Sequence, residues 1–145
     1  MQDFILDPQL AADTIELGEL SVCKILLMND SQFPWIILVP QRANITELYQ
    51  LSNNDITQVQ KESLIISRLM MQHFNGDKLN TGALGNVVSQ LHLHHIVRFK
   101  TDPVWPKPVW GNIKAIPYSH DKLAKLTESL KGLIDNAHTD DIKPV

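Results

Sequence analysis

The sequence is most informative at Gln90-Leu91-His92-Leu93-His94-His95-Ile96-Val97-Arg98, where polar and apolar residues alternate. Alternation is typical of a β-strand, and we expect a long strand over residues 87–99. Side chains two residues apart on a strand share a face, so Gln90, His92 and His94 should point together. The apolar side chains between them would bury the opposite face and fix the register. The strand therefore presents a row of polar side chains on one face.

A polar row that includes two imidazoles suits phosphate chemistry. Histidine can act as nucleophile, base or acid near neutral pH, and His92 and His94 on one rigid strand can divide these tasks against a phosphate ester. Two other interpretations stay open: a solvated, inactive histidine-rich edge of the sheet, and a metal site that adds His95 or His73 as a ligand. A closed zinc site lacks ligands here, because the chain has one cysteine and no second clustered pair. We expect no metal and no cofactor.

The strands around this stretch predict a sheet. Residues 15–28 are rich in Ile, Leu and Val and suggest two short strands joined by a tight turn at Gly18. Residues 35–40 form a continuous β-prone run closed by proline, which is typical of a central strand buried on both faces. An irregular strand and turn should follow over residues 77–85.

Two helices accompany these strands. Ser52 begins a run of capping residues before a helix that should end at Asn75-Gly76, and Ser119 should cap a second helix. The inward faces are expected to be Ile56, Val59, Ser63, Ile66, Met70 and Phe74 on the first, and Leu123, Leu126, Leu130 and Leu133 on the second. We predict an α+β fold, an antiparallel sheet of about five strands with one long helix packed on it plus a C-terminal helix. It forms one domain over residues 1–137, with a flexible tail over 138–145.

Composition limits the classes of function. The chain has 145 residues, 43% hydrophobic and 20% charged, as expected for one globular domain. A net charge of −3 with 13 scattered basic residues argues against binding long nucleic acid but allows a small anionic ligand. No apolar run approaches the ~20 residues of a membrane helix, and the N-terminus lacks the basic region of a signal peptide. The one cysteine, Cys23, cannot form an intrachain disulfide. We expect a cytoplasmic protein without a membrane partner.

With these residues in view, the chain resembles the histidine-triad (HIT) family, whose signature is His-φ-His-φ-His on a strand, with φ apolar. The corresponding residues are Gln90-Leu91-His92-Leu93-His94, preceded by Asn80-x-Gly82 and Gly85-Asn86-Val87-Val88 in the places of two family motifs. The resemblance covers residues 15–98 and implies the HIT-like fold. Glutamine at the first triad position and the tryptophan-rich loop over residues 102–111 resemble a bacterial subgroup that is diadenosine polyphosphate hydrolase-like.

The resemblance also implies roles for individual residues. His92 would attack the α-phosphorus of a nucleotide and hold a transient nucleotidyl group. Gln90 would support His92 through its backbone carbonyl, but it cannot give up a proton as an imidazolium can. His94 would contact the phosphate. The candidate substrate-binding residues are Asn29, Asn80, Asn86 and Trp110.

Several of these assignments have alternatives. Asn86 could donate a hydrogen bond to a non-bridging phosphate oxygen, and Asn29 matches a ribose-binding position. Asn29 could equally close an Asx turn. Trp110 could stack on a base, or could pack against the domain or a dimer partner.

We predict a nucleotide phosphohydrolase that acts on a nucleoside phosphoester, phosphoramidate or dinucleoside polyphosphate through a covalent nucleotidyl-histidine. The alternatives are a nucleotide-binding module with little turnover and a nucleotidyl transferase. The expected partners are a small-molecule nucleotide substrate and, by family resemblance, a second copy of the chain in a homodimer.

Overall fold

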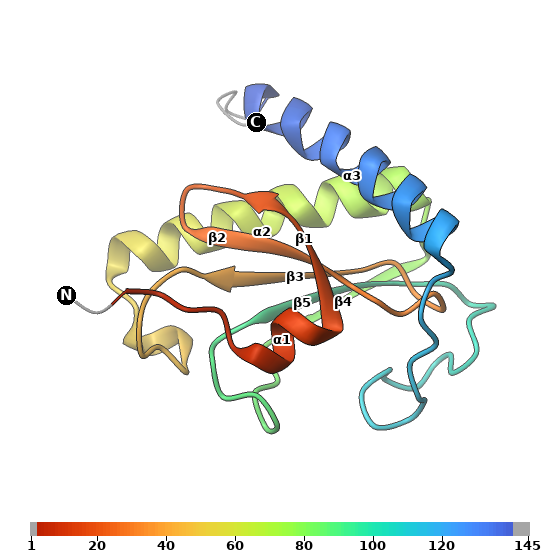
Figure 1. Ribbon diagram of the computed structural model, residues 1–145, viewed down its shortest axis with the longest axis horizontal. Helices are drawn as coiled ribbons and strands as arrows, with labels where there is room; N and C mark the ends of the chain where they lie inside the picture. The colour runs from red at the N-terminus through yellow and green to blue at the C-terminus, as the bar shows by residue number, and fades with distance from the viewer. Residues whose placement is uncertain (1–2, 141–145) are drawn as a thin grey trace.

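The computed structural model describes residues 3–140, with side chains through residue 137. A five-stranded antiparallel sheet in the order β1-β2-β3-β5-β4 forms its centre, and helices pack on the sheet (Figure 1). The predicted α+β fold is confirmed. In chain order the elements are α1 (Pro8–Asp13), β1 (Thr14–Glu19), β2 (Cys23–Met28), β3 (Trp35–Pro40), the 3-10 helix η1 (Leu48–Gln50), α2 (Asn53–Phe74), β4 (Lys78–Gly82), β5 (Leu93–Arg98) and α3 (His120–Asp140).

The strand β3 is the middle of the sheet, and all of its residues are buried, as the continuous apolar run predicted. It pairs with β2 on one side and with β5 on the other. On β5, His94 lies between Ile37 of β3 and Gly82 of β4. The histidine-bearing strand is therefore held from both edges, which gives His94 a rigid backbone position.

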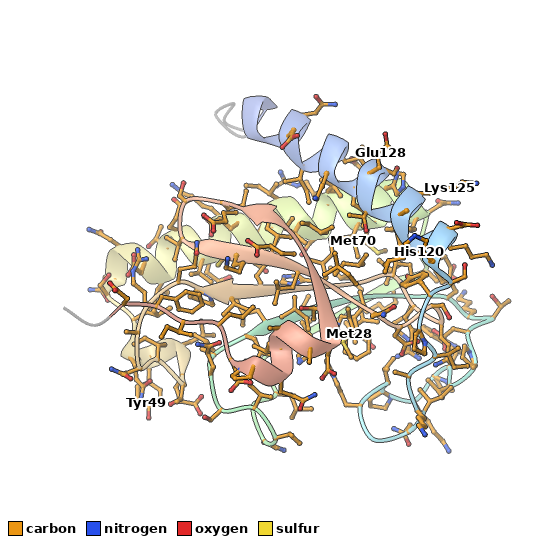
Figure 2. The ribbon with its side chains drawn as sticks, in the orientation of Figure 1. Met28, Tyr49, Met70, His120, Lys125 and Glu128 are labelled. Carbon is orange, nitrogen blue, oxygen red and sulfur yellow. The ribbon has the colours of Figure 1, made fainter. Side chains whose placement is uncertain are left out.

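The two faces of the sheet carry different layers. Figure 1 shows α2 and α3 above the sheet, and α1 with the connections on either side of β5 below it. Each face has its own apolar cluster: one includes Met70 of α2 and Leu130 of α3, and the other includes Leu10 of α1 and Val109 of the loop after β5. In Figure 2 the labelled Met70 lies on the side of the two long helices and the labelled Met28 lies near α1.

The expected helices are both present. Ser52 caps α2, because its Oγ accepts a hydrogen bond from the Asp55 N–H at 3.1 Å. The helix ends at Asn75, which adopts the left-handed conformation with φ of 51°. Gly76 follows because a Cβ there would collide with the Val97 side chain. Val59, Ile66 and Met70 of the predicted face are buried, as is Glu62, which the pattern missed.

The C-terminal helix α3 begins directly after Ser119, whose carbonyl accepts the Leu123 N–H. Leu130 is fully buried, and the other expected leucines pack on the same cluster together with Ile134. The helix continues through Asp140, and residues 141–145 of the expected tail lie outside the described residues. Within the described range no helix is long and apolar enough to cross a membrane.

Two expectations about strands were wrong in detail. Gly18 does not form the turn between the first strands but lies inside β1 at a β-bulge, with φ of 151°. The turn comes later and is closed by a hydrogen bond of 2.8 Å from the Leu20 N–H to the Cys23 carbonyl. The carboxylate of Glu62 accepts the Val22 and Cys23 N–H groups at 2.7 and 3.0 Å, so α2 fixes this turn.

The strand expected over residues 87–99 is shorter than predicted and spans Leu93–Arg98. Residues 83–92 form an irregular connection, because the chain leaves the sheet before Leu93. The Leu91 N–H donates to the Ile45 carbonyl at 3.0 Å instead of to a neighbouring strand. The short helix α1 was not predicted, although its start carries a signal: Asp7 caps it through a 2.8 Å hydrogen bond from the Gln9 N–H, and Pro8 follows at the first helical position.

Candidate active site

A cavity of about 360 Å³ opens on the face of the sheet that carries α1, and His92 and His94 line it. We call it the histidine cavity. Its walls come from α1, from the ends of β2 and β3, from the connection before β5 and from the loop after it. Most of the other lining side chains are apolar: Leu10, Met28, Trp35, Ile37, Leu84, Val87, Val88, Val109, Trp110, Ile113 and Ala115. Asp13 and Asp30 also line it, and none of its lining residues is a lysine or an arginine.

The His92 ring has a defined tautomer. Its Nδ1 lies 2.6 Å from the backbone carbonyl oxygen of Gln90. A carbonyl oxygen only accepts, so Nδ1 carries the hydrogen and Nε2 keeps its lone pair. The side chain is 5% exposed and lines the histidine cavity. The backbone carbonyl of Gln90 therefore holds the His92 ring so that Nε2 is left with a free lone pair.

The His94 ring has the opposite tautomer. Its Nδ1 accepts a hydrogen bond of 3.0 Å from the indole Nε1–H of Trp35, so the hydrogen of the neutral imidazole is on Nε2. Burial lowers the pKa of His94 to about 3, and the nearby His92 and His95 act in the same direction. The rings of His92 and His94 meet edge to face at a centroid distance of 4.9 Å. A nucleophilic nitrogen and a neutral N–H donor are thus side by side.

His95 lies on the other face of the strand, as the alternation predicted. Its Nδ1–H donates to the Leu93 carbonyl at 3.1 Å, and its Nε2 accepts from the Ser63 hydroxyl at 2.7 Å. Burial lowers its pKa to about 4. His95 ties β5 to α2 and does not share a cavity with the other two histidines. Among residues 3–140, no group of three or more His, Cys, Asp or Glu side chains could hold a metal ion.

Gln90 was expected to point with the two histidines, and this prediction was wrong. Its carboxamide donates to the Ile5 carbonyl and accepts from the Asp7 N–H, both at 2.8 Å. The side chain therefore holds the segment that leads into α1 and does not line the histidine cavity. The part of Gln90 that serves the site is its backbone carbonyl, which bonds His92.

A model of the HIT domain matches residues 9–101, which is more than half of the chain. The chain belongs to the HIT domain family. A histidine triad protein from Marinobacter aquaeolei VT8 is 47% identical, with 94% of this chain and 99% of that chain covered and a TM-score of 0.90. A histidine triad (HIT) protein from Sinorhizobium meliloti 1021 is 40% identical, with 92% and 96% covered and a TM-score of 0.86. A histidine triad protein from Bradyrhizobium japonicum is 34% identical, with 92% and 99% covered and a TM-score of 0.88. No curated protein matches this chain.

The candidate asparagines of this HIT domain lie in different places. Asn86 lines the histidine cavity. Asn29 does not: its Oδ1 accepts the Tyr118 N–H at 3.0 Å and holds the segment before α3 against the end of β2. Asn80 accepts a hydrogen bond of 2.8 Å from the Arg98 guanidinium. The structure therefore brings one of the three asparagines to the two histidines.

Trp110 lines the histidine cavity, and its ring lies edge to face with His94 at 5.3 Å. The loop that carries it is anchored by Arg98, which is 1% exposed and bonds Asp102 at 2.7 and 3.1 Å. Trp105 and Phe33 lie against the same guanidinium at 5.6 and 5.7 Å. Neither this anchor nor the contact of Trp35 with His94 was predicted from the sequence. The spacing of an arginine and an aspartate four residues apart at the start of the loop was the available signal for the anchor.

Proposed function

We propose that this HIT protein is a nucleotide hydrolase in which His92 forms a covalent bond to the α-phosphorus of its substrate. The observation that carries the proposal is the pair of complementary tautomers: His92 keeps an Nε2 lone pair, and His94 presents an Nε2–H, in one cavity. A nucleophile and a hydrogen-bond donor for the developing charge are the two groups that phosphoryl transfer needs.

The chemistry has two steps. The Nε2 lone pair of His92 attacks the α-phosphorus, a nitrogen–phosphorus bond forms, and the bond to the leaving group breaks with its electron pair on the leaving atom. Water then attacks the same phosphorus, which releases the nucleoside monophosphate and restores His92. The Nε2–H of His94 donates to a non-bridging oxygen in both steps, and Asn86 in the cavity wall offers a second donor.

The volume of the cavity and its apolar wall suit the base of a nucleotide. A volume of about 360 Å³ falls in the usual range for small-molecule sites, roughly 300–1,000 Å³. The side chains of Leu10, Met28 and Ile37 offer an apolar wall for a base, and Trp110 offers an aromatic edge beside His94. Substrates in this proposal are nucleoside phosphoesters, phosphoramidates and dinucleoside polyphosphates, with the diadenosine polyphosphate hydrolase-like subgroup as the nearest model.

A nucleotide-binding module with little turnover is the second candidate. Gln90 favours this binding module, because the first triad position brings no ionisable side chain to the cavity. The Gln90 carboxamide instead bonds the backbone of the N-terminal segment. A nucleotidyl transferase differs from the hydrolase only in the acceptor of the second step, where another nucleophile replaces water.

Turnover of a substrate panel separates these candidates. The wild type, His92→Ala and His120→Ala are each incubated with adenosine and guanosine phosphoramidates, aryl phosphoesters and dinucleoside polyphosphates. His120→Ala is the control, because His120 is exposed and lies outside the cavity. We expect release of nucleoside monophosphate by the wild type and the control, and loss of about three orders of magnitude in kcat/KM for His92→Ala. Tight nucleotide binding without turnover would establish the binding module instead, and unchanged turnover in His92→Ala would exclude the proposed nucleophile.

A further inference from the structure

Trp35 makes a direct polar contact with His94. It opens β3, is 6% exposed, and directs its indole Nε1–H to Nδ1 of His94 at 3.0 Å. An indole N–H can donate but cannot accept. The hydrogen bond therefore exists only while Nδ1 of His94 keeps its lone pair, which places the imidazole hydrogen on Nε2.

The surroundings prevent His94 from turning away. The Trp35 ring lies 5.6 Å from the imidazole centroid on one side, and the Trp110 ring lies 5.3 Å from it on another. On the sheet, His94 is paired with Ile37 and Gly82. The Trp110 ring also lies beside Gly82, because a Cβ at that position would be in ordinary van der Waals contact with the ring at 3.5 Å. Rotation of the imidazole by half a turn would replace the acceptor of Trp35 with a carbon.

We propose that Trp35 is a positioning residue that keeps His94 a neutral Nε2–H donor, and that the site consequently turns over substrates whose leaving group departs without a proton from the enzyme. The first half concerns the unliganded protein. The second half rests on the proposed function, because it concerns the step in which His92 displaces the leaving group.

The hydrogen bond and the burial of His94 support the first half. Protonation of Nδ1 would place two N–H donors against each other in a buried contact, which costs the full hydrogen bond as well as the desolvation of a cation. The pKa of His94, about 3, agrees with this, and its causes are burial followed by His92 and His95. Asp13, from α1, and Asp30, after β2, line the same cavity and would act in the opposite direction, but neither is among the causes that set the pKa of His94.

The second half follows because no group of the triad can supply a proton to the leaving group, and the carboxylates of Asp13 and Asp30 accept hydrogen bonds from neighbouring residues. The first triad position points to the N-terminal segment, so Gln90 brings no acid to the cavity. His94 can donate a hydrogen bond but not a proton near neutral pH. A leaving group that is a weak base, such as a nucleoside polyphosphate or a phenolate, can depart as an anion. An alkylamine or an alkoxide needs a proton in the same step and would react slowly.

Nitrogen-15 NMR of histidine-labelled protein without ligand tests the first half. For the wild type we expect His94 with a protonated Nε2 and an unprotonated Nδ1, unchanged from pH 7.5 to pH 5. In Trp35→Phe the ring remains but the donor is lost, so the two tautomers should mix and His94 should begin to protonate at a higher pH. Trp110→Phe is the matched control and should keep the wild-type tautomer. A hydrogen on Nδ1 in the wild type, or an unchanged His94 spectrum in Trp35→Phe, would overturn the role of Trp35.

Aryl esters of adenosine monophosphate that differ in the acidity of the phenol test the second half. We expect kcat/KM to fall steeply, by about tenfold or more, from the most acidic phenol to the least acidic, because no proton reaches the leaving oxygen. The corresponding alkylamine phosphoramidate should react more slowly still. A flat dependence on phenol acidity would overturn the second half. Absence of turnover with every ester would instead contradict the proposed function, while the NMR result would still decide the role of Trp35.

Discussion

Each of the three histidines between positions 92 and 95 has different chemistry, because their ring nitrogens have different partners. His92 donates to a backbone carbonyl, His94 accepts from an indole, and His95 lies between a carbonyl and a hydroxyl. Sequence alternation predicted which of them share a face. It could not predict the tautomers, because Trp35 and Ser63 come from elements far away in the chain. The hydrogen-bond partner of a ring nitrogen determines the tautomer, and for His94 and His95 that partner is brought near only by the tertiary structure.

The buried histidines should make stability depend on pH. The pKa values of His94 and His95 are lowered to about 3 and about 4, whereas an unfolded histidine titrates near 6.5. Below about pH 6.5 the unfolded state therefore binds more protons than the native state, so the free energy of unfolding falls as the pH falls. From pH 7 to pH 5 we expect a loss of about 2 kcal/mol per histidine, measured by urea denaturation.

The exposed His120 supplies the control for this pH dependence. His120→Gln should show the same loss between pH 7 and pH 5 as the wild type. His94→Gln should show about half of it, because one of the two buried imidazoles is gone. A free energy of unfolding that does not change between pH 7 and pH 5 would contradict the buried, neutral state of both rings.

The direction of the Gln90 side chain could not be predicted from the alternation of polar and apolar residues. Period-two alternation placed it with the histidines, but its carboxamide bonds the backbone of residues 5 and 7, more than eighty positions away in the sequence. Its carbonyl, which any residue could supply, is the group that serves His92. The contact of the Gln90 carbonyl with His92 was thus predicted correctly, whereas the direction of the Gln90 side chain was predicted wrongly.

Among the elements, helices were easier to predict from sequence than strand ends. The caps and apolar spacing of α2 and α3 are local features, and both helices begin where the capping serines predicted. The end of a strand depends on its neighbour. β5 begins at Leu93, which pairs with Leu38 of β3, and the chain before it bonds other segments. The sequence of residues 87–92 alone does not contain that information.

The loop after β5 is held by one buried ion pair, and breaking it should be costly. The side chains of Arg98 and Asp102 are 1% and 2% exposed. Asp102→Asn keeps the shape but leaves the guanidinium without its charge partner, so we expect a loss of about 3 kcal/mol in the free energy of unfolding. Chemical denaturation measures it. Because the same loop carries Trp110, the histidine cavity should also lose nucleotide affinity.

The ion pair between Arg42 and Asp55 is the matched control, because its 2.8 Å contact is as short but its side chains are 41% and 20% exposed. Asp55→Asn should cost about 1 kcal/mol or less. Equal losses in the free energy of unfolding for Asp55→Asn and Asp102→Asn would contradict the larger cost that we expect from the buried position of the Arg98–Asp102 ion pair.

At the scale of the whole molecule, one face of the sheet packs against the two long helices, and the other face carries the candidate active site. The helices α2 and α3 cover one face of the sheet (Figure 1), and that face carries the larger apolar cluster and His95. The other face carries α1, the anchored loop and the histidine cavity. The predicted order of strands and helices was enough to foresee a sheet with helices packed on it. It was not enough to foresee the cavity, whose walls join the beginning, middle and end of the chain.

The homodimer remains a prediction from the family resemblance. The two tryptophans of the loop after β5 make contacts within the chain, because Trp105 lies on Arg98 and Trp110 lies on His94. We expect size-exclusion chromatography with light scattering to give twice the chain mass of 16.4 kDa. A mass equal to one chain at micromolar concentration would contradict the homodimer and leave the account of the cavity unchanged.

The most direct measurement of the proposed role of His92 is rapid-quench mass spectrometry with a reactive aryl ester of adenosine monophosphate. The reaction is stopped in alkaline denaturant, because a phosphorus–nitrogen bond to histidine is labile in acid, and the adduct is located by peptide mapping. We predict a transient adenylyl group on His92 that forms before product accumulates and is missing in His92→Ala. Product formation without any adduct on His92, or an adduct on another residue, would contradict the covalent mechanism.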